Sequence, residues 1–107
     1  MNLSNNDYIK IVKHYGIVLP KTKKGTTNIN KTKKLAKKIL ADKLCTCIKK
    51  VTRTSKLRES GAIAICNKSI FTRRNIKHFR FTCKKRNKLL NKKGTKNALE
   101  KTKNKIF

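Results

Sequence analysis

Residues 31–51, KTKKLAKKILADKLCTCIKKV, decide the fold, because they carry the clearest secondary-structure signal in the chain. Apolar residues recur there at intervals of three and four, which is the spacing of one face of an α-helix. Lysines fill most of the other positions, so one side of this helix should pack on a core and the other should face anions. The apolar face comprises Leu35, Ala36, Ile39, Leu40, Leu44, Cys47, Ile48 and Val51.

A shorter helix is predicted before this one, over residues 4–15. Ser4 followed by Asp7 fits a capping-box start, with Asp in place of the usual Glu. Apolar residues then follow at i, i+4 and i+7 from Tyr8, and Gly16 can adopt the left-handed conformation that ends a helix. Residues 1–20 are therefore predicted to be a helix followed by an extended segment.

Residues 21–30, KTKKGTTNIN, are polar and contain glycine, so they are predicted to be a linker. Residues 31–83 are predicted to form the core of a single small domain, with the central helix followed by a hairpin. Residues 84–107 are rich in lysine and poor in apolar residues, which predicts a basic tail that is disordered alone and ordered by a partner.

The hairpin is predicted from two short runs. Residues 61–66, GAIAIC, are an apolar run of strand length, and residues 78–83, HFRFTC, alternate with the period of two that is typical of a strand. Pairing of these runs predicts a small α+β domain with two helices, a short antiparallel sheet and a basic C-terminal tail.

The charge of the chain is extreme for its size. In 107 residues it has 31 Lys and Arg but only four Asp and Glu, for a formal net charge of +27. An A/T-rich genome would enrich lysine without any functional demand, but it would enrich Asp and Glu as well, so their scarcity indicates selection for positive charge. Such a charge destabilises a compact state unless a polyanion neutralises it. The expected partner is nucleic acid, DNA rather than RNA, with an acidic capsid or chromatin-like protein surface as the alternative.

Three basic surfaces are predicted to bind nucleic acid: the lysine face of the central helix, the loop before residue 78, and the tail. Because 25 of the basic residues are lysine, diffuse phosphate neutralisation is favoured over base reading. Tryptophan is absent and the phenylalanines alternate like core residues, so platforms for stacking single-stranded bases are not favoured. The predicted contact residues are Lys33, Lys34, Lys37, Lys38, Arg73, Arg74, Lys77, Arg80, Lys84, Lys85, Arg86, Lys88, Lys92 and Lys93.

The four cysteines, Cys45, Cys47, Cys66 and Cys83, have three possible states. The leading hypothesis is a structural zinc site, because four thiolates suffice for a closed tetrahedral site. Buried thiols and disulfides are the alternatives. A helix places residues i and i+2 about 200° apart, so Cys45 and Cys47 can share a metal only if the helix ends near Leu44. His14 and His78 are weaker candidate ligands.

Motifs for catalysis are absent from the sequence. It contains no phosphate-binding G-x-x-x-x-G-K-S/T loop, no H-E-x-x-H and no pair of neighbouring carboxylates, which predicts a protein that is not an enzyme. It also lacks an apolar stretch of about 18 residues and an apolar signal core in MNLSNNDYIK. A location inside a cell or a particle is therefore expected, without secretion and without a transmembrane segment.

Three strings resemble a family of short, basic, four-cysteine proteins of nucleocytoplasmic large DNA viruses: LADKLCTCIKKV, AIAICNKSIF and FRFTC. The resemblance covers roughly residues 35–83 and implies a viral setting, in the virion or in a virus factory of the host cytoplasm or nucleus. Two functions compete in that setting. One is sequence-independent binding and condensation of DNA, and the other is a minor structural protein that binds acidic capsid or inner-membrane surfaces.

Overall fold

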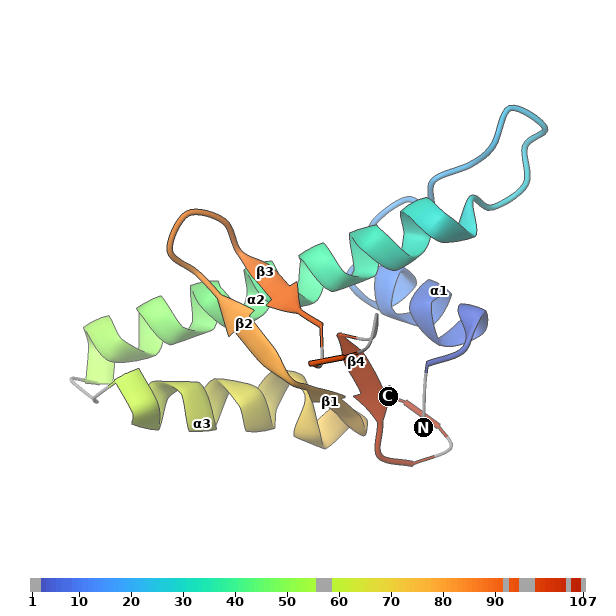
Figure 1. Cartoon of the computed structure of the whole chain (residues 1–107). Helices are drawn as coiled ribbons and strands as arrows, with labels where there is room; N and C mark the ends of the chain where they lie inside the picture. The colour runs from blue at the N-terminus through green and yellow to red at the C-terminus, as the bar shows by residue number, and fades with distance from the viewer. Residues whose placement is uncertain (1–2, 56–58, 92, 95–97, 104, 107) are drawn as a thin grey trace.

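Helix α2 (Ile29–Ser55) is the longest of the described elements, and the other described helices and strands pack around it (Figure 1). The computed structural model describes residues 3–55, 59–91, 93–94, 98–103 and 105–106. Helix α1 (Asn5–His14) lies against the N-terminal half of α2, and α3 (Glu59–Ile70) lies along its C-terminal half. The described residues also include four strands of three residues each, so the α+β prediction is confirmed.

Helix α1 begins with the predicted capping box. The backbone N–H of Ser4 donates to Oδ2 of Asp7 at 2.8 Å, and that of Asp7 donates to Oγ of Ser4 at 3.3 Å. Nζ of Lys101 lies 3.0 Å from the same Asp7 oxygen, which joins the first helix to the last strand. Burial raises the pKa of Asp7, but the hydrogen bonds from Ser4 and Lys101 outweigh it and leave the pKa below its usual value. The predicted stop is also present, since Gly16 has a φ of +70°.

Helix α2 continues well past Leu44, although its C-terminal half is rich in β-branched residues. The hydroxyl of Thr52 donates to the carbonyl of Ile48 at 2.8 Å, and the hydroxyl of Thr54 donates to that of Lys50 at the same distance. These bonds return the threonine hydroxyls to the helix backbone, where they are tolerated. The break near Leu44 that a four-cysteine zinc site would need is therefore not present.

Residues 61–66, which were predicted to be a strand, lie in helix α3 instead. Ala62, Cys66 and Ile70 follow one another at intervals of four and are buried, at 0, 0 and 8% exposure. Ile65, in contrast, is 49% exposed, so this apolar helix has one buried face and one exposed face. A short continuous apolar run fits a buried helix as well as a buried strand, and here the regular spacing out to Ile70 was the signal for a helix.

The strands also pair differently from the prediction. β1 (Ile76–His78) pairs antiparallel with β4 (Leu99–Lys101), and β2 (Arg80–Thr82) pairs antiparallel with β3 (Lys88–Leu90). The partners of the predicted second strand therefore come from residues 84–107. In contrast with the expectation of a tail that is disordered alone, the described residues of that segment are folded onto the domain. Its core residues are Leu89, Ala98, Leu99 and Ile106.

The predicted linker contains a short turn that extends beyond the start of α2 (Figure 1). Lys21 and Thr27 form an isolated antiparallel bridge, and the backbone N–H of Thr22 donates to the carbonyl of Thr26 at 2.7 Å. Gly25, at a φ of +81°, allows the chain to reverse. The lysines of this turn are exposed to solvent.

His78 at the end of β1 lies among aromatic rings. Its ring centroid is 4.5 Å from that of Phe71 and 5.6 Å from that of Phe81. Both ring nitrogens are buried, and within the described part of the chain neither has a hydrogen-bond partner. Burial lowers the pKa of His78 below its ordinary value of 6.5, because the charged form loses its hydration. The folded protein therefore favours the neutral ring.

We expect this histidine to make the fold less stable in mild acid. As the pH falls below 6.5, the unfolded chain binds a proton at residue 78 that the folded chain excludes, so the free energy of unfolding decreases. The expected loss between pH 7.5 and 5.5 is about 1 kcal/mol or less, because the ring is only half-buried. Urea unfolding at the two pH values measures it. H78L should remove this loss, and H14L at the exposed end of α1 is the matched control, which should keep it.

Candidate nucleic-acid interface

The four cysteines form two disulfides, so the zinc prediction is wrong. Cys45 pairs with Cys83 and Cys47 pairs with Cys66, with Cα atoms 5.8 and 5.9 Å apart. Over the residues that the structure describes, no group of three or more His, Cys, Asp or Glu is placed to hold a metal ion. The physical reason is the unbroken α2, which directs side chains at i and i+2 to different sides and so keeps Cys45 and Cys47 apart.

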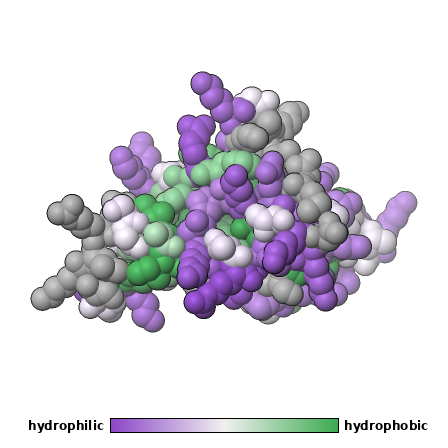
Figure 2. Space-filling model, turned by 90° about the horizontal axis from the view of Figure 1, so that it is seen from below, coloured by the Kyte–Doolittle hydropathy of each residue, from purple (hydrophilic) through white to green (hydrophobic). Residues whose placement is uncertain are grey.

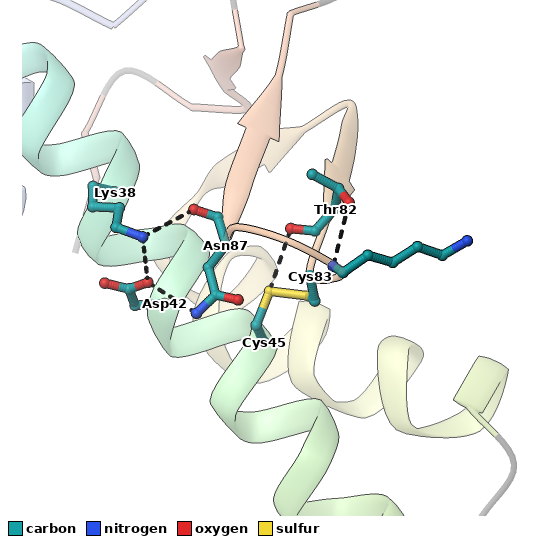
Figure 3. Close-up of a disulfide and its surroundings, with 7 residues drawn as sticks. Lys38, Asp42, Cys45, Thr82, Cys83 and Asn87 are labelled. Carbon is teal, nitrogen blue, oxygen red and sulfur yellow. Dashed lines mark hydrogen bonds and ion pairs between the residues drawn. A yellow bond between two sulfur atoms is a disulfide. The ribbon is translucent and has the colours of Figure 1, made fainter.

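The two disulfides join α2 to different parts of the molecule. The Cys47–Cys66 bond joins it to the middle of α3. The Cys45–Cys83 bond joins it to the residue that follows β2, where the chain turns towards β3 (Figure 3). Sγ of Cys45 also lies 3.7 Å from the backbone carbonyl of Thr82. A disulfide sulfur carries no proton, so this is a packing contact and not a hydrogen bond.

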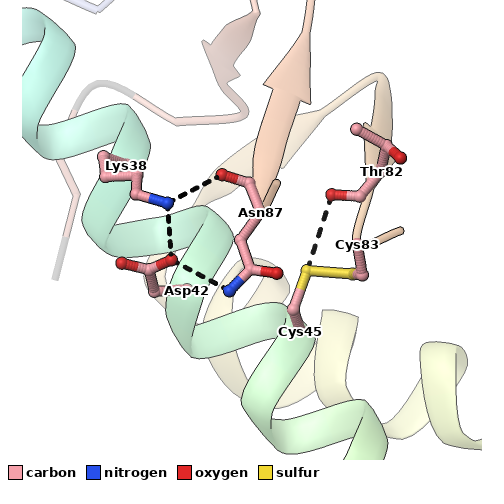
Figure 4. A network of polar contacts seen from close by, with 6 residues as sticks. All are labelled: Lys38, Asp42, Cys45, Thr82, Cys83 and Asn87. Carbon is pink, nitrogen blue, oxygen red and sulfur yellow. Dashed lines mark hydrogen bonds and ion pairs between the residues drawn. A yellow bond between two sulfur atoms is a disulfide. The ribbon is translucent and has the colours of Figure 1, made fainter. Parts of the chain in front are cut away.

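The far end of the same turn is held by a polar network (Figure 4). Nδ2 of Asn87 donates to Oδ1 of Asp42 at 3.0 Å, and Nζ of Lys38 donates to the backbone carbonyl of Asn87 at 3.3 Å. Lys38 and Asp42 pair with each other at 3.1 Å. Lys38, Asp42 and Cys45 stand at i, i+4 and i+7 on α2, so a single helix face holds both ends of the turn.

Between these two anchors lie Lys84, Lys85 and Arg86, which are called the cationic loop below. All three residues are exposed. The disulfide at residue 83 and the hydrogen bonds at Asn87 restrict where their backbone can go. The backbone that carries three successive positive charges is thus restrained before any partner arrives, which reduces the ordering cost of binding.

Beside this loop is a cavity of about 450 Å³ between α2 and β3, which is called the basic hollow below. Two predicted surfaces, the helix lysines and the C-terminal segment, meet there although they are about 50 residues apart in sequence. Burial, together with the positive charge of Lys33, lowers the pKa of Lys37, so an anion bound here would relieve unfavourable electrostatics. The hollow is lined by Lys34, Lys37, Lys38, Arg86, Asn87, Lys88, Leu89 and Asn91.

The other predicted contact residues belong neither to the cationic loop nor to the lining of the basic hollow. Arg74 lines a separate cavity with Lys43 and Lys50, and Lys77 lines another with Phe79. Lys33 lies over the ring of Tyr8, with Nζ 5.8 Å from the ring centroid. The residues Arg73, Arg80 and Lys93 are exposed, and Lys92 lies outside the described residues.

Sequence reasoning did not identify Asp42 and Asn87 as residues that position the site. The i, i+4, i+7 spacing of Lys38, Asp42 and Cys45 was present in the sequence as a possible signal. Their partners lie 38 to 49 residues further along the chain, however, and no local pattern indicates which segment would approach this face.

Comparisons with family models, with curated proteins and with solved structures found no match to this chain. Among the helices described here, none is both long and apolar enough to cross a membrane.

Proposed function

We propose that this protein is a non-catalytic, sequence-independent nucleic-acid-binding protein, which binds and condenses DNA by neutralising its phosphates. The observation that carries the proposal is the cationic loop, which a disulfide and the hydrogen bonds of Asn87 hold beside the lysines of α2. Lysine ammonium groups contact phosphates as point charges and do not need to read bases.

The charge balance supports a polyanionic partner. Four acidic residues cannot neutralise 31 basic ones, whatever their pairing. Two of the acids, Asp7 and Asp42, are moreover engaged with lysines that hold the fold together. Most of the positive charge is therefore left for an external partner, and a phosphate backbone releases condensed counterions when it binds such a surface.

The disulfides support a location inside a virus particle. Disulfides persist in oxidising settings, among them the virion, and are rare in the reducing cytosol. The resemblance of residues 35–83 to proteins of large DNA viruses agrees with packaging alongside a DNA genome. In this proposal the oxidised form described here is the packaged form.

A minor structural role in the virion is the second candidate, and the exposed part of α3 favours it. Ala64 and Ile65 are exposed there, and Figure 2 shows hydrophobic side chains gathered at one end of a face that is otherwise largely hydrophilic. An acidic capsid or inner-membrane surface with an apolar contact would fit this end. Retention of the protein in particles emptied of genome by nuclease would favour this role over DNA binding.

The test of the proposed function is a fluorescence-anisotropy titration with DNA duplexes of unrelated sequence at several salt concentrations. If about eight phosphates are contacted, a fourfold rise in salt should weaken binding by roughly four decades, and the sequences should bind alike. Parallel titrations with RNA and with anionic vesicles identify the preferred polyanion. Affinity for DNA that does not change with salt, or an absence of binding, would contradict the proposal.

A further inference from the structure

A second cavity, of about 550 Å³, lies on the other side of the cationic loop and differs in character from the basic hollow. Its apolar wall is made by Ile48 of α2, Ile63 of α3 and Phe81 of β2, and exposed lysines stand at its edge. It is called the apolar hollow below. The complete lining is Cys45, Ile48, Lys49, Thr52, Ile63, Phe81, Thr82, Cys83 and Lys84.

Both hollows share lining residues with a third cavity at the cationic loop. This third cavity, of about 450 Å³, is lined by the loop together with Thr82 and Lys88. It shares Arg86 and Lys88 with the basic hollow, and it shares Thr82 and Lys84 with the apolar hollow. Basic side chains therefore line neighbouring cavities from the α2 lysines, past the cationic loop, to the apolar hollow that Phe81 lines.

Positive charges beside an apolar hollow with an aromatic ring fit single-stranded nucleic acid better than a duplex. A duplex keeps its bases stacked inside and offers mainly phosphates to a surface of this kind. A single strand has unpaired bases that can leave the backbone and stack on an aromatic ring, while positive charges track the phosphates. The apolar hollow also offers the hydroxyl of Thr52, whose hydrogen is used within α2 but whose oxygen can still accept a bond from a base.

We infer that the protein binds single-stranded nucleic acid in preference to duplex, with an unpaired base beside Phe81 in the apolar hollow and the neighbouring phosphates on Lys49 and the cationic loop. This inference rests on the proposed function and names its substrate class. It departs from the sequence prediction, in which Phe81 was a core residue. In the structure the ring is half-buried, contacts His78 and also lines the hollow.

The experiment compares three fluorescent ligands of equal length: a thymidine strand, an abasic strand with the same phosphates, and a duplex. The wild-type protein should bind the thymidine strand roughly 5- to 150-fold more tightly than the abasic strand, which is the usual range for stacking of one base. F81L should lose most of this difference. F79L is the matched control, because Phe79 lies two residues away but lines a different cavity, and it should keep the difference.

The outcomes separate the inference from the proposed function. Equal affinity for strands with and without bases, or a preference for the duplex, overturns the inference and leaves phosphate binding intact. Failure to bind any of the three overturns the proposed function itself. A strand with 2-aminopurine in place of one base gives a readout on the unaltered protein, should F81L fail to fold. Its fluorescence should change on binding as the base leaves its neighbours for the apolar hollow, and unchanged fluorescence counts against the inference.

Discussion

Replacement of both cysteines of either disulfide by serine is expected to cost several kcal/mol of stability. The Cys45–Cys83 bond closes a span of 38 residues and the Cys47–Cys66 bond one of 19. In the chain-entropy description, spans of these lengths correspond to about 4 and about 3 kcal/mol respectively. Small domains are stable by only about 5–15 kcal/mol in total, and the charge of +27 works against compactness. Urea unfolding of the fully reduced protein at low salt should therefore show it largely unfolded.

The two double variants serve as controls for each other. C47S/C66S should lower stability but keep the cationic loop attached to α2. C45S/C83S should lower stability and also weaken DNA binding, measured where both variants are still folded, because the loop loses one anchor. A urea midpoint that does not move on reduction, or zinc in freshly purified protein, would contradict the disulfide arrangement.

Replacement of the whole cationic loop should have the largest effect on binding. With Lys84, Lys85 and Arg86 all changed to alanine, the slope of log affinity against log salt should become shallower by up to about 2.7, since each phosphate contact contributes about 0.9. At physiological salt this corresponds to a roughly hundredfold loss of affinity. Anisotropy titrations of the variant and the wild-type protein over the same salt series measure both quantities.

The matched control removes the same charge elsewhere. Lys10, Lys13 and Lys103 are exposed, and none of them lines the basic hollow, the apolar hollow or the cavity at the cationic loop. Lys10 and Lys13 belong to α1, which Figure 1 shows apart from the turn between β2 and β3. Replacement of all three should have a much smaller effect, because charges beyond about 10 Å are screened. Equal losses in the two triple variants would show that net charge alone matters.

The neutral change N87A tests positioning without any change in charge and should weaken binding moderately.

Features that are local in sequence could be predicted. The capping box of Ser4 and Asp7 marks the start of α1, and the apolar residues of α2 recur at the helical period. Both predicted helices are present. The strand partners could not be predicted, because pairing of residues 76–78 with 99–101 depends on packing between distant segments. Residues 61–66 are a continuous apolar run, which has no period of its own to separate a helix from a strand.

The candidate site shows the same division. The cations were identified from composition, but their arrangement around the loop follows from Asp42, Asn87 and a disulfide, whose partners are remote in sequence. The zinc prediction failed on one structural point. In a helix the side chains at i and i+2 point about 200° apart, so Cys45 and Cys47 could share a metal only if the helix ended near Leu44. Helix α2 continues beyond Leu44, so they cannot.

The opposite orientations of Cys45 and Cys47 on α2 also bear on how the chain acquires its bonds. Four thiols can join in three ways, and only one of these isomers is the native one. A formed α2 excludes the bond between the two neighbours and presents one sulfur to α3 and the other to the end of β2. A helix that has formed before the thiols are oxidised therefore excludes the Cys45–Cys47 bond and favours the native isomer.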